Sequence, residues 1–158
     1  MTNCLNIITV NIVEQEWVVN DMREILFKAK TEKIVRTYNN GLDDGVWVQG
    51  YLRCDCGMWL IYQFEYDRAD QVAYEVNPET ICQFTGRYDV NKKRIWENDI
   101  VKNIIDGDIY KCAWNSYNCE YELRNEKESF GLGYINPHSY EVVGNAIDNP
   151  ELLKGGVE

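Results

Sequence analysis

The residues of this chain best suited to chemistry are its six cysteines and its single histidine. Cys54 and Cys56 lie one residue apart, and Cys112 and Cys119 could supply a second pair of sulfur ligands. Structural zinc sites usually take such ligands as two pairs, with roughly two to four residues between the members of each pair. The spacing here departs from that pattern. We therefore predict that Cys54 and Cys56 lie at a hairpin tip, that the other cysteines are small buried side chains, and that no metal is bound.

Histidine and carboxylate side chains give no catalytic pattern either. His138 follows Asn136 and Pro137 with no nucleophile motif nearby, which favours a surface turn over a general base. Aspartates in turns usually accept hydrogen bonds from backbone amides, and no segment has the ligand spacing of a calcium-binding loop. We expect no catalytic residue and no cofactor. The closely spaced carboxylates, all in or beside predicted turns, are Asp43 and Asp44, Glu97 and Asp99, and Asp106 and Asp108.

The charge balance disfavours nucleic acid as a partner. With 16 basic and 26 acidic residues the net charge is −10, and an acidic surface repels phosphate. The first of two basic runs alternates with Phe27 and Ala29, as on the solvent face of a strand, and the second is expected in a solvated turn. The two runs are Lys28, Lys30, Lys33 and Arg36, and Arg87, Lys92, Lys93 and Arg94.

Membrane insertion and secretion are also disfavoured. No apolar stretch approaches the roughly 18 residues of a membrane span. The N-terminus lacks the basic region of a secretion signal, and Asn6, Thr9 and Asn11 interrupt its apolar run. We expect a cytoplasmic protein whose six cysteines are reduced thiols.

The pattern of hydrophobic residues predicts an all-β fold. Strands at 46–54 and 58–66 flank a turn at 55–57, and strands at 100–105 and 109–115 flank the Asp-Gly turn at 106–108. Such spacing is typical of a barrel or sandwich. We predict a small hairpin-built barrel with an N-terminal β lobe, followed by one helical turn after Asn149 and Pro150. Further strands are predicted at 119–124, 130–135 and 139–145, whereas residues 22–33 fit a helix or a strand.

Four segments resemble the phage YopX-like family, and they occur in the family's order. The third is the most specific, with Gln83-Phe84-Thr85-Gly86 followed by Glu97-Asn98-Asp99-Ile100-Val101. The resemblance implies an all-β fold, self-association, and a gene carried by bacteriophages or prophages. It favours a strand at residues 22–33 and implies no established biochemical activity. The four segments are 22–29, 46–52, 78–101 and 141–153.

Two departures from the family pattern fall at backbone bends. The chain has Asn91-Lys92 where such proteins usually have Asn-Gly. A lysine in the left-handed region would cost about 1–2 kcal/mol, so either the turn is longer here or the hairpin is weaker. Asn98 stands where the family has glycine, and asparagine can keep the same left-handed bend. Neither departure changes the fold prediction.

We predict one YopX-like domain at residues 22–154, with lobes at about 22–75 and 76–154 and a short tail at 155–158. Residues 1–21 would precede it as an N-terminal extension. They are interpreted as a translated leader, with Met22 as the true start. The alternative is an extra edge strand, since Ile7, Ile8 and Val10 are rich in β-branching.

The predicted function is binding without catalysis. We expect a phage accessory protein of the bacterial cytoplasm that forms homo-oligomers and binds an unknown phage or host protein. Trp96, Glu97 and Asp99 are the candidate interaction surface, although Asp99 is also expected to fix the turn that enters the strand at 100–101. The alternatives are a cysteine-based metal protein and a nucleic-acid-associated regulatory factor.

Overall fold

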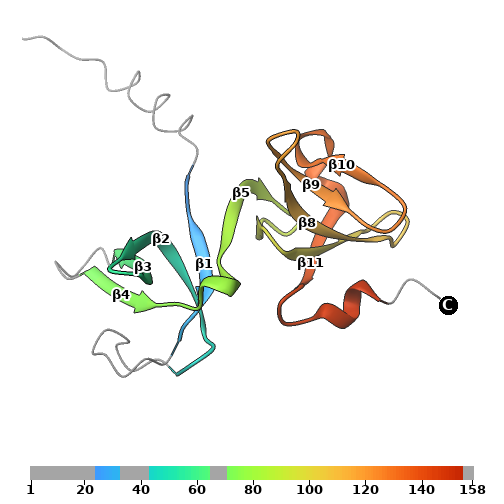
Figure 1. Cartoon of the computed structure of the whole chain (residues 1–158). Coiled ribbons are helices and arrows are strands. Elements are labelled where there is room, and N and C mark those ends of the chain that lie inside the picture. The colour runs from blue at the N-terminus through green and yellow to red at the C-terminus, as the bar shows by residue number, and fades with distance from the viewer. Residues whose placement is uncertain (1–23, 33–42, 65–70, 155–158) are drawn as a thin grey trace, which may run out of the picture.

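The computed structural model describes residues 24–32, 43–64 and 71–154, which form β-strands, short 3₁₀ helices and loops. The strands make two antiparallel sheets (Figure 1). The all-β prediction is therefore confirmed, and the described part of the ambiguous segment at 22–33 contributes a strand at Phe27–Lys30. None of the described helices is long and apolar enough to cross a membrane.

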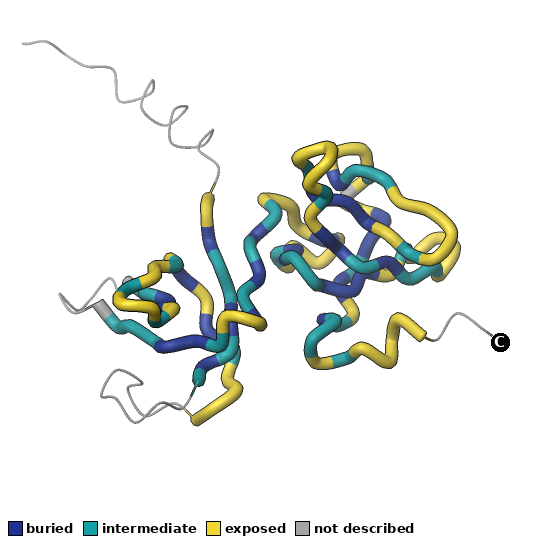
Figure 2. Tube along the Cα trace, viewed as in Figure 1, coloured by how far each residue is buried: buried dark blue, intermediate teal, exposed yellow. Residues whose placement is uncertain are grey.

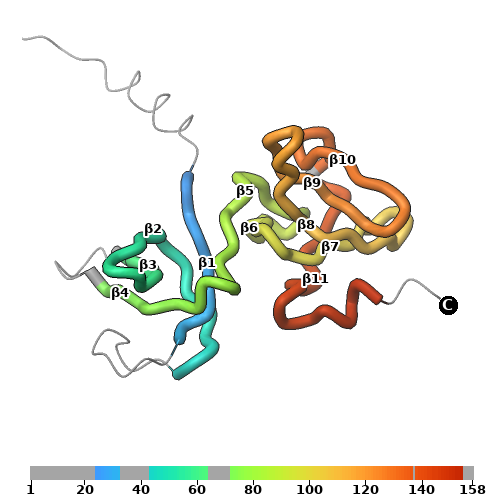
Figure 3. Tube along the Cα trace, in the orientation of Figure 1, coloured from blue at the N-terminus to red at the C-terminus, as the bar shows by residue number. Residues whose placement is uncertain are grey.

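The first sheet has six strands in the order β4-β3-β2-β1-β5-β6. Because β5 pairs with β1, this sheet continues past residue 76. β5 and β6 lie between the two halves of the molecule, which are strands β1–β4 and the strands that follow residue 98 (Figure 3). Its strands are β1 Phe27–Lys30, β2 Trp47–Asp55, β3 Met58–Phe64, β4 Gln71–Glu75, β5 Cys82–Tyr88 and β6 Arg94–Trp96.

The second sheet has five strands in the order β10-β9-β8-β7-β11. Neither sheet closes on itself within the described part of the chain, so the barrel is not confirmed. After Asn149 the structure has a 3₁₀ helix, η4. The strands are β7 Asp99–Asn103, β8 Ile109–Asn115, β9 Glu120–Arg124, β10 Ser129–Gly131 and β11 Tyr140–Asn145; the 3₁₀ helices are η1 Pro78–Thr80, η2 Leu132–Tyr134, η3 Pro137–Ser139 and η4 Pro150–Leu153.

Turn chemistry explains where the predicted strands end. The predicted β2–β3 hairpin is present, but its turn has only two residues, Cys56 and Gly57, with φ of 49° and 82°, while Asp55 and Cys54 are paired within β2. In the second hairpin β7 ends at Asn103, because the Asn103 amide already donates to the Asp108 carbonyl and closes a longer loop. The strand predicted at 130–135 is also shorter, since η2 turns Leu132 into the core.

Three hydrophobic clusters fill the interior. The segments coloured as buried in Figure 2 lie mainly in strands of both sheets. The largest cluster lies under the second sheet and includes Ile95 of β6, so β6 contributes to both halves. Another packs beneath the first sheet around Ala29 and Ile61. The third joins the two halves. We call it the junction cluster, and it consists of Leu26, Cys82, Phe84 and Trp96, with Trp47 and Ile147 packed against it.

The turn between β5 and β6 shows how the Asn91-Lys92 departure is accommodated. Of the two predicted alternatives, the longer turn is the one observed, and Lys92 nevertheless takes a left-handed φ of 61°. The Asp89 side chain is buried and accepts hydrogen bonds from the backbone amides of Asn91, Lys93 and Val142 at 2.8–3.0 Å. One carboxylate thus holds the turn together and ties it to β11.

This geometry predicts that Lys92→Gly stabilises the protein. Glycine removes the left-handed strain but has a larger entropy in the unfolded chain, so the free energy of unfolding should rise by about 0.5–1 kcal/mol. Chemical denaturation measures the change. Lys93→Gly is the matched control: Lys93 lies outside the left-handed region, so the same substitution there should be destabilising. Equal effects at the two positions would contradict the argument.

Candidate functional site

The predicted surface of Trp96, Glu97 and Asp99 lies at the connection between β6 and β7, where the two sheets meet. Trp96 is 6% exposed and Asp99 1% exposed, whereas Glu97 is partly exposed. Asn98 has a φ of 64°, so it keeps the bend for which the family uses glycine. Two of the three side chains therefore belong to the interior, and only Glu97 reaches the surface.

The Asp99 carboxylate joins strands from both sheets. Its Oδ1 accepts hydrogen bonds from Lys28 Nζ at 2.6 Å and from Asn145 Nδ2 at 3.0 Å, and its Oδ2 accepts one from the Trp96 amide at 2.9 Å. The bond to Trp96 closes the turn that enters β7, which is the role predicted for Asp99. The bond to Lys28 adds a connection to β1, far away in the sequence.

Lys28 and Lys30 face the junction, so their predicted place on a solvent face is wrong. Lys28 Nζ lies 5.1 Å from the centre of the Trp47 ring and 5.5 Å from that of Trp96. Lys30 forms an ion pair with Asp148 and lies 5.6 Å from the Trp47 ring. Alternation predicted the strand correctly, but both of its faces are covered. Lys33 and Arg36 of this run fall outside the described residues.

Asp148 links the segment after β11 to Lys30 of β1 and Trp47 of β2. Its Oδ2 accepts a hydrogen bond from Trp47 Nε1 at 2.6 Å. Burial raises the pKa of the Asp148 carboxyl, but the hydrogen bonds from Lys30 and Trp47 outweigh burial and hold that pKa below its usual value. The charged form of Asp148 is therefore the one that stabilises the junction.

The described cysteines differ in exposure, and His138 lies at the surface. Cys54, Cys56 and Cys119 are exposed, which corrects the expectation of a buried Cys119, while Cys82 and Cys112 are buried. Burial raises the pKa of both interior thiols, which disfavours a nucleophilic thiolate. In the described ranges, no three His, Cys, Asp or Glu side chains are placed to hold a metal ion. His138 lies exposed in η3, and Cys4 falls outside those ranges.

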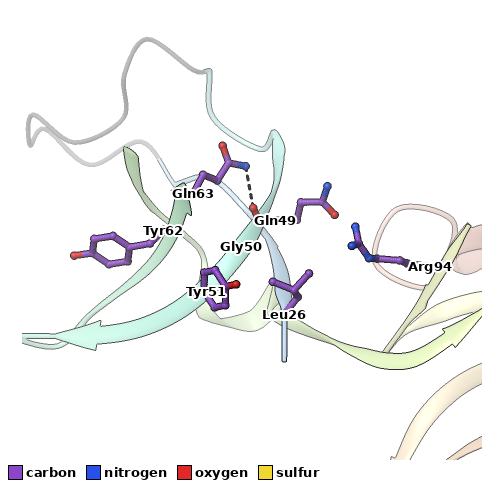
Figure 4. A pocket seen from close by; sticks show the side chains of 7 residues that line it. All are labelled: Leu26, Gln49, Gly50, Tyr51, Tyr62, Gln63 and Arg94. Carbon is purple, nitrogen blue, oxygen red and sulfur yellow. Dashed lines mark hydrogen bonds between the residues drawn. The ribbon is translucent and has the colours of Figure 1, made fainter. Parts of the chain in front are cut away.

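A groove of about 450 Å³ opens beside the junction, where sequence patterns gave no signal. Figure 4 shows Tyr51 and Tyr62 on one side and Arg94 on the other, with its guanidinium directed towards Gln49 and Leu26. Leu26 belongs to the junction cluster, so the buried core continues into the wall of the groove. The residues that line it are Leu26, Gln49, Gly50, Tyr51, Tyr62, Gln63 and Arg94.

Strand pairing creates this groove. Gly50 lies opposite Phe27 of β1, and a side chain there would collide with the backbone carbonyl of Tyr62. The absence of a side chain lets β3 bend close over β2. Gln63 Nε2 donates to the Gln49 carbonyl at 2.9 Å, which fixes the Gln63 side chain in the wall of the groove.

Arg94 is held firmly at the opposite wall, so the prediction that it lies in a solvated turn is wrong. Its guanidinium carbon lies 5.5 Å from the centre of the Phe84 ring, and its Nη2 donates to Glu24 Oε2 at 3.0 Å. Arg94 is the first residue of β6 rather than part of the turn. Only the register of β5 and β6 could have revealed this, and a bulge between Phe84 and Arg87 shifts that register.

The Asp99 network predicts that Asp99→Ala is strongly destabilising. Removing one member of a largely buried ion pair leaves Lys28 without its charge partner and the Trp96 amide without its acceptor, at a cost of about 3–5 kcal/mol. Denaturant unfolding measures the loss, and a double-mutant cycle with Lys28→Met separates the ion pair from the other hydrogen bonds. Glu126→Ala, at an exposed loop carboxylate, should change stability by less than about 0.5 kcal/mol.

Asp148 predicts a pH-dependent contribution to stability. Because its pKa is lowered on folding, the stabilisation is complete above the unfolded pKa of about 3.9 and is lost as the pH falls through the folded value. Asp148→Asn should therefore be less stable than the parent at pH 7, and the difference should shrink near pH 3. Unfolding at both pH values tests this, and a pH-independent difference would contradict it.

Residues 14–154 match the YopX protein family, and the match begins before Met22, where the resemblance was expected to start. No curated protein matches the chain. Since the match covers most of the sequence, including both sheets and the groove, this protein belongs to the YopX family.

Proposed function

We propose that this YopX-family protein is a non-enzymatic phage or prophage accessory protein that works by binding other proteins in the bacterial cytoplasm. The groove beside the junction carries the proposal. It combines an apolar wall, two tyrosines, two glutamines and one arginine. Sites of this kind, with apolar and aromatic surface and a few placed polar groups, are typical of ligand recognition.

The composition of the groove favours binding over catalysis. None of its seven lining residues is Ser, Cys, His, Asp or Glu, the types that most often act as nucleophile or general base. Tyrosine and arginine, by contrast, are enriched among the residues that dominate protein interfaces. Partner binding therefore uses the residues that the groove offers.

Self-association is the second part of the proposal. Large aromatic side chains are exposed on the second half of the molecule, where Tyr117 is 94% and Tyr134 is 88% exposed. Trp114 is also exposed and stacks edge-on against Tyr121. Exposed aromatic residues are enriched at subunit contacts, so these side chains support a homo-oligomer.

The basic side chains around the junction and the groove are paired with carboxylates, which favours a protein partner over nucleic acid there. Lys28, Lys30 and Arg94 are paired with Asp99, Asp148 and Glu24. Phosphate binding would have to displace these carboxylates against a net charge of −10. Neither the nucleic-acid alternative nor the cysteine-based metal alternative has an observation in its favour in the described part of the chain.

Light scattering coupled to size exclusion tests self-association. At high micromolar concentration we expect a molar mass that is a multiple of the monomer mass. Tyr117→Ser and Tyr134→Ser, at almost fully exposed positions, should each change stability by less than about 0.5 kcal/mol, and at least one should shift the equilibrium towards monomer. A monomeric parent protein would refute the oligomer.

A further inference from the structure

We propose that Arg94 is a carboxylate subsite for an acidic peptide segment of the protein partner, and that Glu24 occupies this subsite in the free chain. The inference rests on the proposed function and specifies the chemistry of its groove. It makes Glu24 an internal competitor that the partner must displace.

Arg94 is pre-organised for binding. Its guanidinium stacks near the buried ring of Phe84, and its backbone is fixed by the pairing of β6 with β5. The side chain is 33% exposed, so part of the guanidinium still faces the groove. A held arginine loses little conformational freedom when it binds, and its planar fork matches a carboxylate.

The contact with Glu24 uses the guanidinium fork of Arg94 incompletely. Both Glu24 oxygens share a single nitrogen, Nη2, at 3.0 and 3.3 Å. Arg94 Nε is buried and has no hydrogen-bond partner. A carboxylate that approached side-on could accept from Nε and Nη2 together, which is the stronger bidentate arrangement. A carboxylate that displaced Glu24 and reached Nε as well as Nη2 would therefore be bound more strongly than Glu24 is.

The rest of the groove suits a peptide. Gln49 is exposed, and its side-chain amide offers both a donor and an acceptor to a peptide backbone. Leu26 and the ring of Tyr51 supply apolar contact surface. A single carboxylate needs only one cation, whereas a nucleic acid would bring many phosphates towards an acidic protein.

The experiment titrates the full chain with acetyl-Phe-Glu-amide and follows amide chemical shifts by NMR. Acetyl-Phe-Gln-amide, which lacks only the charge, is the matched probe. We expect shifts at residues around the groove and weaker binding of the neutral probe. Equal affinity for the two probes, or shifts confined to other parts of the chain, would overturn the inference. So would tighter binding of a single-stranded decathymidylate at the same residues.

Variants then separate the two roles. Glu24→Gln should strengthen binding of the acidic probe about two- to fivefold, since a competing surface ion pair is lost. Arg94→Gln should weaken it about tenfold or more, and Arg94→Lys should not restore it because lysine lacks the fork. Arg124→Gln, at an ion pair with Glu122 on β9 of the second sheet, is the charge-matched control and should have no effect.

The gain in Glu24→Gln carries the test, because that variant alters an exposed side chain and should fold normally. Weaker or unchanged binding in Glu24→Gln would overturn the competition. Light scattering on the same samples keeps the two proposals distinguishable. An intact oligomer that ignores the probe would refute only the subsite, and a monomer that binds it would refute only self-association.

Discussion

A charged carboxylate in the interior must find donors for its oxygens, and this requirement at Asp99 organises the molecule. Burying such a group without partners is strongly unfavourable. Asp99 meets the requirement with donors from β1, from the end of β6 and from β11. The strands that supply them come from both sheets. Satisfying one carboxylate therefore fixes how the first sheet lies against the second.

The groove depends indirectly on the contacts of Asp99. Lys28 is held by Asp99 and flanked by Trp47 and Trp96, which keeps β1 and β2 against the junction. Leu26, two residues before Lys28, is consequently buried beside Phe84, the ring on which Arg94 stacks. The walls of the groove thus come from distant parts of the chain that the junction brings together.

Local rules predicted the features that depend on local chemistry. The Cys56-Gly57 turn, the strand alternation at 27–30 and the left-handed bend at Asn98 all follow from short-range backbone preferences. The role of Asp99 in its turn is of the same kind. What failed was the assignment of faces. Lys28 and Lys30 alternate with apolar residues whichever way the strand faces, and only the second sheet makes their side inward. The groove is less predictable still, because it requires the register of β2, β3 and β6 at once.

The tryptophans in the junction have a spectroscopic consequence. Trp47 and Trp96 both lie beside the ammonium group of Lys28, while Trp59 and Trp114 are exposed on other strands. Two of the chain's five tryptophans are thus part of the contact between the sheets. Indole emission responds to the polarity and the charge around the ring. Separation of the sheets would hydrate these two rings and leave the environment of the exposed pair unchanged. The intrinsic fluorescence of this protein is therefore a label-free reporter of whether its two halves stay docked.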